Sequence, residues 1–338
     1  MSIVADATAR HEQIGQAVLA AACLGLSVPL VVRWVRRGPL NRPERLPHGT
    51  TAWPLAMALG WGLLVWIMVP YAYVSWRGPA LHQAATQPAT APSATPATMP
   101  TAEEIARPAS PPDGTFDLAG LPPRDVAFLA AVPNLAVFIA LVALDRSIFG
   151  GGLRPLGFSA RQAAAGLATG AKFSIAFVPL VLGSAVLTDW IYQWFDYTHP
   201  REHDLLRVLG ESVEPIVRVA LAAGAVVVAP LSEELLFRGH GQTILRAGLA
   251  RLGGYHPTDP DGPAPSVPPA WATWGAIVLA SALFAAVHDP WTWPPIFLLS
   301  MGLGWAYERT GNLWAPVAIH AAFNAVSTLI FLAGAGAN

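Results

Sequence analysis

Long apolar stretches separated by short polar ones dominate the chain. Stretches near the roughly 20 residues that a helix needs to cross a bilayer lie at 16–32, 52–76, 126–144, 163–190, 215–230, 271–287, 296–307 and 313–333. The pattern predicts an all-α fold, a polytopic membrane helical bundle with about eight transmembrane helices. Residues 233–252 are less apolar, and we expect them to form a helix inside the bundle or along its interface.

A Pro-, Ala- and Thr-rich segment, "QPATAPSATPATMPTAEEIARPASPPDG", separates the second stretch from the third. It has few large apolar residues and cannot bury a core, so we predict a disordered linker. The predicted organisation is a transmembrane helical pair at 1–76, the linker at 77–125 and a core at 126–336. A second Pro- and Gly-rich loop spans 256–269, and no repeat of fixed period is present.

Composition agrees with a membrane protein. The chain is 54% hydrophobic and 12% charged, about half of the roughly 25% charge typical of soluble domains. The 13 Trp suit the headgroup region. We therefore expect the lipid bilayer as a partner and a multi-pass protein of the cell membrane. A net charge of −1 does not indicate a nucleic-acid partner. A single cysteine, Cys23, excludes an intrachain disulfide and a multi-cysteine metal site.

The first apolar stretch predicts an uncleaved helix. "AAAC" at 20–23 resembles a lipoprotein cleavage site, but the apolar run continues past it. The following loop, "RWVRRGPLNRPER", is rich in arginine and should be cytoplasmic. The N-terminus and the linker would then face outward, and the orientation after residue 230 stays open.

Ionisable residues inside spans are costly and are candidates for function. In "SEELLFRGHG", Ser232 is a plausible N-cap after Pro230, and two carboxylates follow it. Glu234 and Arg238 have the i, i+4 spacing of a helical ion pair, which leaves Glu233 without a cationic partner. The alternative is that these residues only cap and pair at the start of an interfacial helix.

Two histidines lie in or at the end of apolar stretches. His288 closes "GAIVLASALFAAVH", and His320 lies inside "LWAPVAIHAAFNAV", with Asn324 at i+4 on the same face. His288 also fits an interfacial histidine, and His320 with Asn324 also fits polar contacts between helices. The other seven histidines, His240 among them, are expected in polar loops or flanks.

Together these groups suit hydrolysis of an amide bond. A carboxylate in an apolar setting can act as general base near neutral pH, and a histidine or an asparagine amide can stabilise the oxyanion. Glu233, His288 and His320 also match a catalytic zinc site with one position open for water. These residues alone leave both mechanisms open.

Three motifs in order carry a family resemblance: "EELLFR" at 233–238 (EExxxR), "FAAVH" at 284–288 (FxxxH) and "HAAFN" at 320–324 (HxxxN). Each is weak alone, but together they resemble the CPBP family of intramembrane proteases, which includes type II CAAX prenyl endopeptidases and bacterial Abi proteins. The resemblance covers about residues 157–336. It implies an intramembrane endopeptidase that acts on a peptide or lipidated protein, of prenylated CAAX type by the family's name.

The resemblance also implies a role for each motif residue. Glu233 would activate water that His288 holds, while His320 and Asn324 would stabilise the oxyanion. Glu234 and Arg238 would position the catalytic helix. Family members are described both as metalloproteases and as metal-independent glutamate proteases. We favour the glutamate mechanism, because the chain has no HExxH or aspartate-rich motif; a zinc ion, if used, would bind Glu233, His288 and His320.

Two other functions compete with the protease. The first is a non-catalytic membrane protein of the same fold that acts in binding or bacteriocin immunity. The second is a small transporter that relays protons through Glu and His. We disfavour the transporter, because the polar groups cluster in one region and a proton path would distribute carboxylates through several spans.

Overall fold

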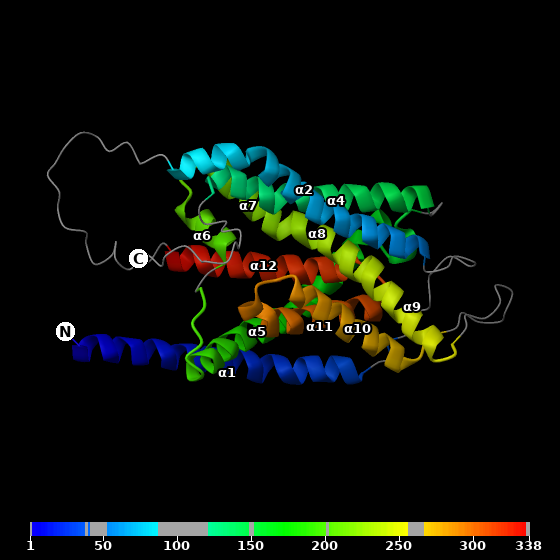
Figure 1. Cartoon of the computed structure of the whole chain (residues 1–338). Helices are drawn as coiled ribbons and strands as arrows, with labels where there is room; N and C mark the ends of the chain where they lie inside the picture. The colour runs from blue at the N-terminus through cyan, green and yellow to red at the C-terminus, as the bar shows by residue number, and fades with distance from the viewer. Residues whose placement is uncertain are drawn as a thin grey trace.

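The computed structural model describes residues 2–37, 40, 53–86, 121–148, 152–200, 203–255 and 267–335, and within them it contains helices, turns and no strand. The all-α prediction is confirmed. The longer helices are arranged as an elongated bundle (Figure 1). They are α1 (Ser2–Arg36), α2 (Trp53–Thr86), α4 (Pro123–Ile148), α5 (Ala160–Trp194), α10 (Ala270–Ala286), α11 (Trp293–Thr310) and α12 (Trp314–Ala335).

A further run of helical segments carries the first motif. It comprises α7 (Pro215–Ala223), the π-helix η3 (Gly224–Val228), α8 (Ala229–Glu233), the π-helix η4 (Glu234–Gln242) and α9 (Thr243–Leu252). The short α6 (Asp204–Glu211) precedes this run. Single 3-10 turns lie at η2 (Arg154–Leu156) and η5 (Pro290–Thr292).

Every predicted span falls on a helix. In the described part of the chain, six stretches are long and apolar enough to cross a membrane: Gly15–Arg36, Pro54–Arg77, Pro123–Ser147, Arg154–Trp194, Pro215–Leu252 and Trp314–Gly334. The stretches expected at 271–287 and 296–307 correspond to the shorter helices α10 and α11. The protein is therefore a polytopic helical membrane protein.

The sequence predicted that the helix with the acidic pair starts at Ser232. The structure has no helix start at this residue. The segments from Pro215 to Leu252 follow one another directly, and Ser232 lies inside α8. Its hydroxyl is 3.0 Å from Ala229 O and 3.0 Å from Asn134 Oδ1 of α4. The N-cap prediction was wrong because Pro230 does not break the helix here. The widened π turn η3 lies just before Pro230, where an α-helix would be interrupted by the missing N–H and the bulk of the ring.

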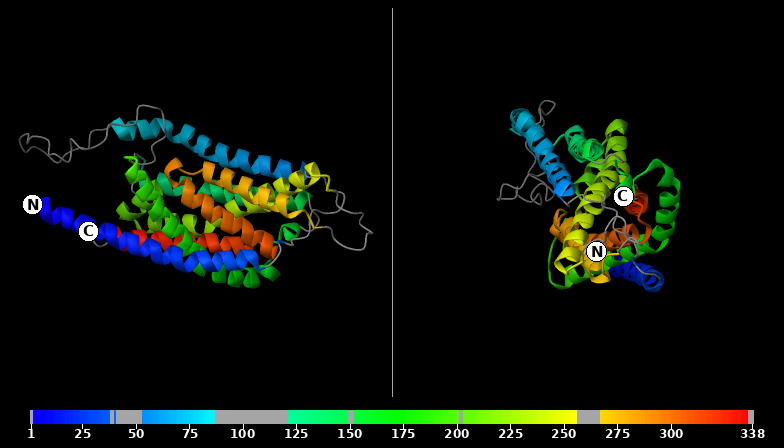
Figure 2. Two further views of the ribbon diagram at one scale, coloured as in Figure 1. Left: turned by 90° about the horizontal axis from the view of Figure 1, so that it is seen from below. Right: turned by 90° about the vertical axis from the view of Figure 1, so that its right-hand side faces the viewer.

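The two N-terminal helices lie on different sides of the bundle. α1 packs along α5, whereas α2 packs along α4 and also contacts η4. Figures 1 and 2 show α1 and α2 far apart across the molecule. Each N-terminal helix therefore covers part of the core, and they do not form a separate two-helix layer. The division of the chain into domains at the linker stays a prediction.

The boundaries of the expected linker differ from the prediction of 77–125. Helix α2 continues to Thr86 and α4 begins at Pro123, so both edges of that range are helical. The remainder of the linker, most of the loop predicted at 256–269 and part of the arginine-rich loop lie outside the described residues. The predicted orientation of the chain in the membrane stays a prediction.

Helix α2 supports the turn that follows the acidic pair. Gly62 lies so close to η4 that a Cβ there would be 2.8 Å from Leu236 Cδ1. Trp66 meets Phe237 edge to face, with ring centroids 6.4 Å apart. Because Leu236 and Phe237 are buried, these contacts fix η4 between α2 and the rest of the bundle.

Candidate active site

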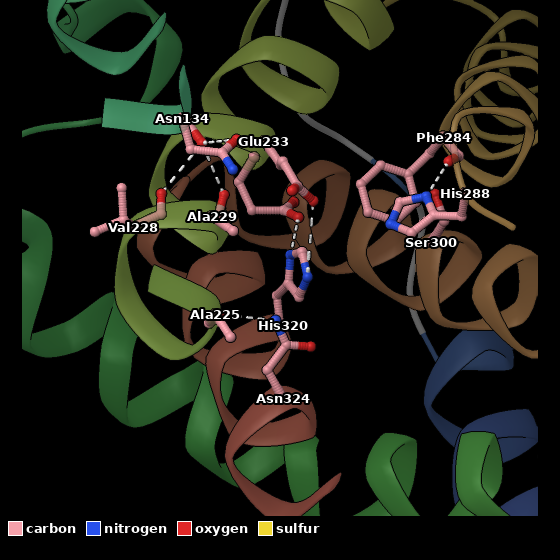
Figure 3. A network of polar contacts seen from close by, with 12 residues as sticks. Asn134, Ala225, Val228, Ala229, Glu233, Phe284, His288, Ser300, His320 and Asn324 are labelled. Atoms are coloured by element: carbon pink, nitrogen blue, oxygen red, sulfur yellow. Dashed lines mark hydrogen bonds and ion pairs between the residues drawn. The ribbon is translucent and has the colours of Figure 1, made fainter. Parts of the chain in front are cut away.

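Three helical elements bring the motif residues to one region of the bundle. Glu233 ends α8, and Glu234 begins η4. His320 and Asn324 lie on α12, and His288 follows the end of α10. Figure 3 shows Glu233 directed at the ring of His320, with Phe284 and His288 to one side.

Glu234 and Arg238 form the buried ion pair that their spacing predicted. Arg238 Nη1 lies 3.1 Å from Glu234 Oε1, with side-chain exposures of 1% and 0%. The guanidinium also donates to Ser300 Oγ at 2.7 Å and lies 4.5 Å from the ring centroid of Phe284. A buried charge needs such partners, because desolvation costs several kcal/mol per ion. Arg238 is thus held by α11 and α10 as well as by its own helix.

Glu234 also orients His320. Its Oε1 lies 2.8 Å from His320 Nδ1. Because a carboxylate paired with arginine accepts hydrogen bonds, Nδ1 carries a proton in this contact. A neutral His320 ring then presents Nε2 as an acceptor. Glu234 therefore sets the tautomer and direction of His320 in addition to pairing with Arg238.

Glu233 faces the other nitrogen of the same ring. Its Oε2 lies 3.9 Å from His320 Nε2, and its side chain is 12% exposed. This buried oxygen has no hydrogen-bond partner among the described residues. Beside a neutral ring both atoms are acceptors, and a water molecule within reach of both would supply a donor. Glu233 is the motif carboxylate that remains available for chemistry.

His288 lies apart from the glutamates. Its Nδ1 is 2.7 Å from Phe284 O of its own helix, and its backbone carbonyl accepts from Trp293 Nε1 at 2.9 Å. The ring of Phe284 is 4.7 Å from that of His288 and 5.8 Å from that of His320. Phe284 therefore contacts both imidazoles, and His320 is the one that directly faces Glu233.

Asn324 compensates for the N–H group that Pro230 lacks. Its Nδ2 donates to Ala225 O at 2.7 Å. In the π register of η3, the N–H of residue 230 would donate to Ala225 O, but proline has no N–H. The Asn324 amide therefore supplies the donor that Pro230 lacks. One of its two N–H groups is used in this contact, and the other remains for a second acceptor.

The residues proposed for zinc do not fit a three-ligand site in this arrangement. Among the described residues, no group of three His, Cys, Asp or Glu side chains is placed to hold a metal ion. Phe284 separates His288 from the ring of His320, and His320 Nδ1 is engaged by Glu234. We derive no step through a metal.

Sequence reasoning missed two residues around the first motif. Ser300 is a buried hydroxyl in the apolar α11, and its only sequence signal is a polar residue among Leu and Met. His240 was expected in a polar loop or flank, but it is fully buried in η4 and contacts Asp145 at 3.0 Å. The prediction for His240 was wrong because the segment after Arg238 is packed on several sides inside the bundle.

Comparison with known proteins agrees with this geometry. A family model described as "type II CAAX prenyl endopeptidase Rce1-like" matches residues 215–326. The matched range starts with α7 and includes all three motifs. No curated protein and no solved structure matches the chain. The resemblance inferred from the motifs is confirmed: residues 215–326 are similar to the Rce1-like family of type II CAAX prenyl endopeptidases.

Proposed function

We propose that this protein is an intramembrane endopeptidase in which Glu233 activates the attacking water. The observation that carries the proposal is the unpartnered Glu233 Oε2, held 3.9 Å from His320 Nε2 at the centre of the motif cluster. Its neighbour Glu234 is committed to Arg238 and His320. The two adjacent carboxylates thus have different surroundings, which suits one reactive and one positioning group.

A water molecule fits the chemistry of the gap. Hydrogen bonds of about 2.8 Å to both Glu233 Oε2 and His320 Nε2 would place it beside the line that joins these atoms. The water would donate both hydrogens, and its lone pairs would face away from the two bases. Water held in this way is a better nucleophile towards a peptide carbonyl.

The reaction balances with these groups alone. The water oxygen bonds to the carbonyl carbon while Glu233 takes a proton, and a tetrahedral oxyanion forms. The carbon–nitrogen bond then breaks, and the proton on Glu233 passes to the leaving nitrogen. The products are a carboxylic acid and an amine, and Glu233 is again a carboxylate.

Asn324 and the histidines are assigned to charge stabilisation and water binding. The second N–H of Asn324 can donate to the oxyanion. His320 becomes a donor at Nε2 once that nitrogen is protonated. His288 lies at the half-exposed end of α10 and would hold water there after a side-chain movement, since catalytic contacts often tighten only with substrate bound.

The test is hydrolysis by purified protein in lipid vesicles. A quenched peptide library with prenylated and unprenylated members is offered to the wild type, Glu233→Gln and Glu233→Ala. We expect cleavage by the wild type and a loss of about 10²- to 10⁴-fold in both variants. Cleavage that persists in both variants would remove Glu233 as the base. The two halves of the library show whether a prenyl group is recognised.

Chelation separates the glutamate mechanism from a metalloprotease. We expect the wild-type rate to stay unchanged in a strong chelator, with no stoichiometric zinc in elemental analysis. A rate that falls on chelation and returns with zinc would overturn the glutamate mechanism. If the folded wild type cleaves no library member, the non-catalytic binding function becomes the better interpretation. Fractionation of cells would test the proposed location in the cell membrane.

A further inference from the structure

A second buried ionisable pair holds the catalytic helix to α4. His240 Nε2 lies 3.0 Å from Asp145 Oδ1, and both side chains are 0% exposed. Asp145 lies near the end of α4, outside the matched family segment, and His240 lies in η4, six residues after Glu234. The contact therefore joins the helix of the first motif to a helix that carries none of the motifs.

The surroundings of His240 fix the number of protons in the pair. Nδ1 lies 2.9 Å from Leu235 O, an acceptor, while Nε2 faces the carboxyl group of Asp145. Nδ1 must therefore carry a hydrogen. A second proton lies between Nε2 and Oδ1, either on the ring or on the carboxyl group. In both forms the pair is neutral overall and both contacts of the ring are hydrogen bonds.

The contact with Leu235 connects this pair to the site. Leu235 directly follows Glu234, and its carbonyl belongs to the turn that presents both glutamates. His240 thus spans from this backbone oxygen to Asp145 of α4. A shift of this turn by about 1 Å can cost on the order of 10²-fold in rate, and the 3.9 Å gap at Glu233 depends on where the turn lies.

We propose that His240 and Asp145 are positioning residues for the catalytic turn. Buried ion pairs seldom add net stability compared with apolar residues of similar volume, and ionisable residues inside a membrane are costly. Such a pair is therefore better explained by the geometry that it imposes. It holds Leu235 O, and through it Glu233 and Glu234, at a fixed depth and rotation relative to α4.

The decisive variant removes both charges at once. Asp145→Leu/His240→Phe leaves no buried charge without a partner and removes only the contact of the ring with Leu235 O, so it should fold as well as the wild type. We expect its kcat to fall about 10- to 100-fold because the tether to Leu235 is lost, with KM changed little. A purely structural role predicts wild-type kcat for any folded double variant. That result would overturn the proposal.

Two further variants serve as controls. In Asp145→Asn the amide can donate to Nε2 while the neutral ring still donates to Leu235 O, so kcat should stay within about threefold of the wild type. Arg77→Met/Asp125→Asn removes the charges of another ion pair, one between α2 and α4, and keeps an oxygen at residue 125 for the hydroxyl of Tyr73. We expect that variant to keep its kcat. A loss as large as that of Asp145→Leu/His240→Phe would contradict a specific role for His240.

The test by kcat rests on the proposed function, because it requires peptidase activity. A second measurement tests the positioning role without any activity. Hydrogen exchange followed by mass spectrometry reports how fast the backbone amides of residues 231–242 exchange in the wild type and in the double variant. We expect about 10-fold faster exchange in this segment of the double variant and unchanged exchange in α12. Unchanged exchange throughout would overturn the positioning role. A wild type without peptidase activity would refute the proposed function alone, and the exchange result would still decide about His240.

Discussion

The two histidines of the motifs occupy contrasting surroundings. His320 is buried, and its two nitrogens face Glu234 and Glu233. His288 is half-exposed, and its ring bonds a carbonyl of its own helix. One histidine is therefore built into a network across helices, while the other is held locally at the end of α10. The difference indicates that the site has a preformed part and an open part.

The preformed part begins at Ser300 and ends at Glu233. Ser300 holds Arg238, Arg238 holds Glu234, and Glu234 directs His320 towards Glu233. The open part contains the half-exposed His288, where the proposed function would admit the substrate. A rigid set of bases beside an accessible side suits hydrolysis, because orientation is set before the substrate arrives.

Breaking the centre of the network should have the largest effect on stability. Glu234→Leu leaves the buried Arg238 without its carboxylate, which costs about 3–5 kcal/mol. We expect a fall in Tm of the detergent-solubilised protein and loss of hydrolysis. The double variant Glu234→Leu/Arg238→Met should recover most of the stability but no activity, since His320 loses its partner at Nδ1. A single variant as stable as the wild type would contradict the buried ion pair.

Substitution of the two histidines tests the contrast directly. His320→Ala removes a buried hydrogen bond to a carboxylate, worth about 1.5–3 kcal/mol, and should lower Tm. His288→Ala should change stability by less than about 0.5 kcal/mol, because its contact is local and half-exposed. Thermal unfolding of both variants in the same detergent is the measurement. Equal losses of stability would show that His288 is part of the preformed network.

Contacts within one helix followed from the sequence, whereas contacts between helices did not. The spacing of Glu234 and Arg238 predicted their ion pair, since i, i+4 residues lie on one face. The same spacing could not show that Glu234 reaches His320, which lies 86 residues away. That contact depends on how α12 packs beside η4, and a single sequence does not contain the packing angle.

Local exceptions to regular helix geometry also limited the prediction. Pro230 indicated a helix boundary, and Ser232 then looked like an N-cap. The π turn η3 before Pro230 keeps the helix continuous, and Asn324 from α12 supplies the donor for Ala225 O. This compensation comes from a residue 99 positions away. The fold class was predictable from the length of the apolar stretches, but this detail depends on tertiary contacts.

The serine at the start of the network should have a moderate effect. Ser300→Ala removes the 2.7 Å contact to Arg238 Nη2 but leaves the ion pair with Glu234. We expect a loss of about 1–2 kcal/mol and a small decrease in kcat. Ser174→Ala is the matched control, since its hydroxyl bonds Gly170 O of its own helix, and it should cost less than about 0.5 kcal/mol. Equal effects of the two substitutions would remove Ser300 from the network.

An exposed ion pair provides the smallest expected effect and the sharpest contrast with Arg238. Arg124 Nε lies 2.8 Å from Glu214 Oε2, as close as the buried contacts, but the two side chains are 76% and 41% exposed. Exposed pairs contribute about 0–1 kcal/mol, because solvent and salt screen the charges. Arg124→Gln should therefore shift Tm little and leave hydrolysis unchanged, and added salt should abolish the remaining difference from the wild type. If Arg124→Gln destabilised the protein as strongly as Glu234→Leu, the distance between the charged groups would alone decide the strength of these pairs. Burial would then not explain why η4 keeps Arg238.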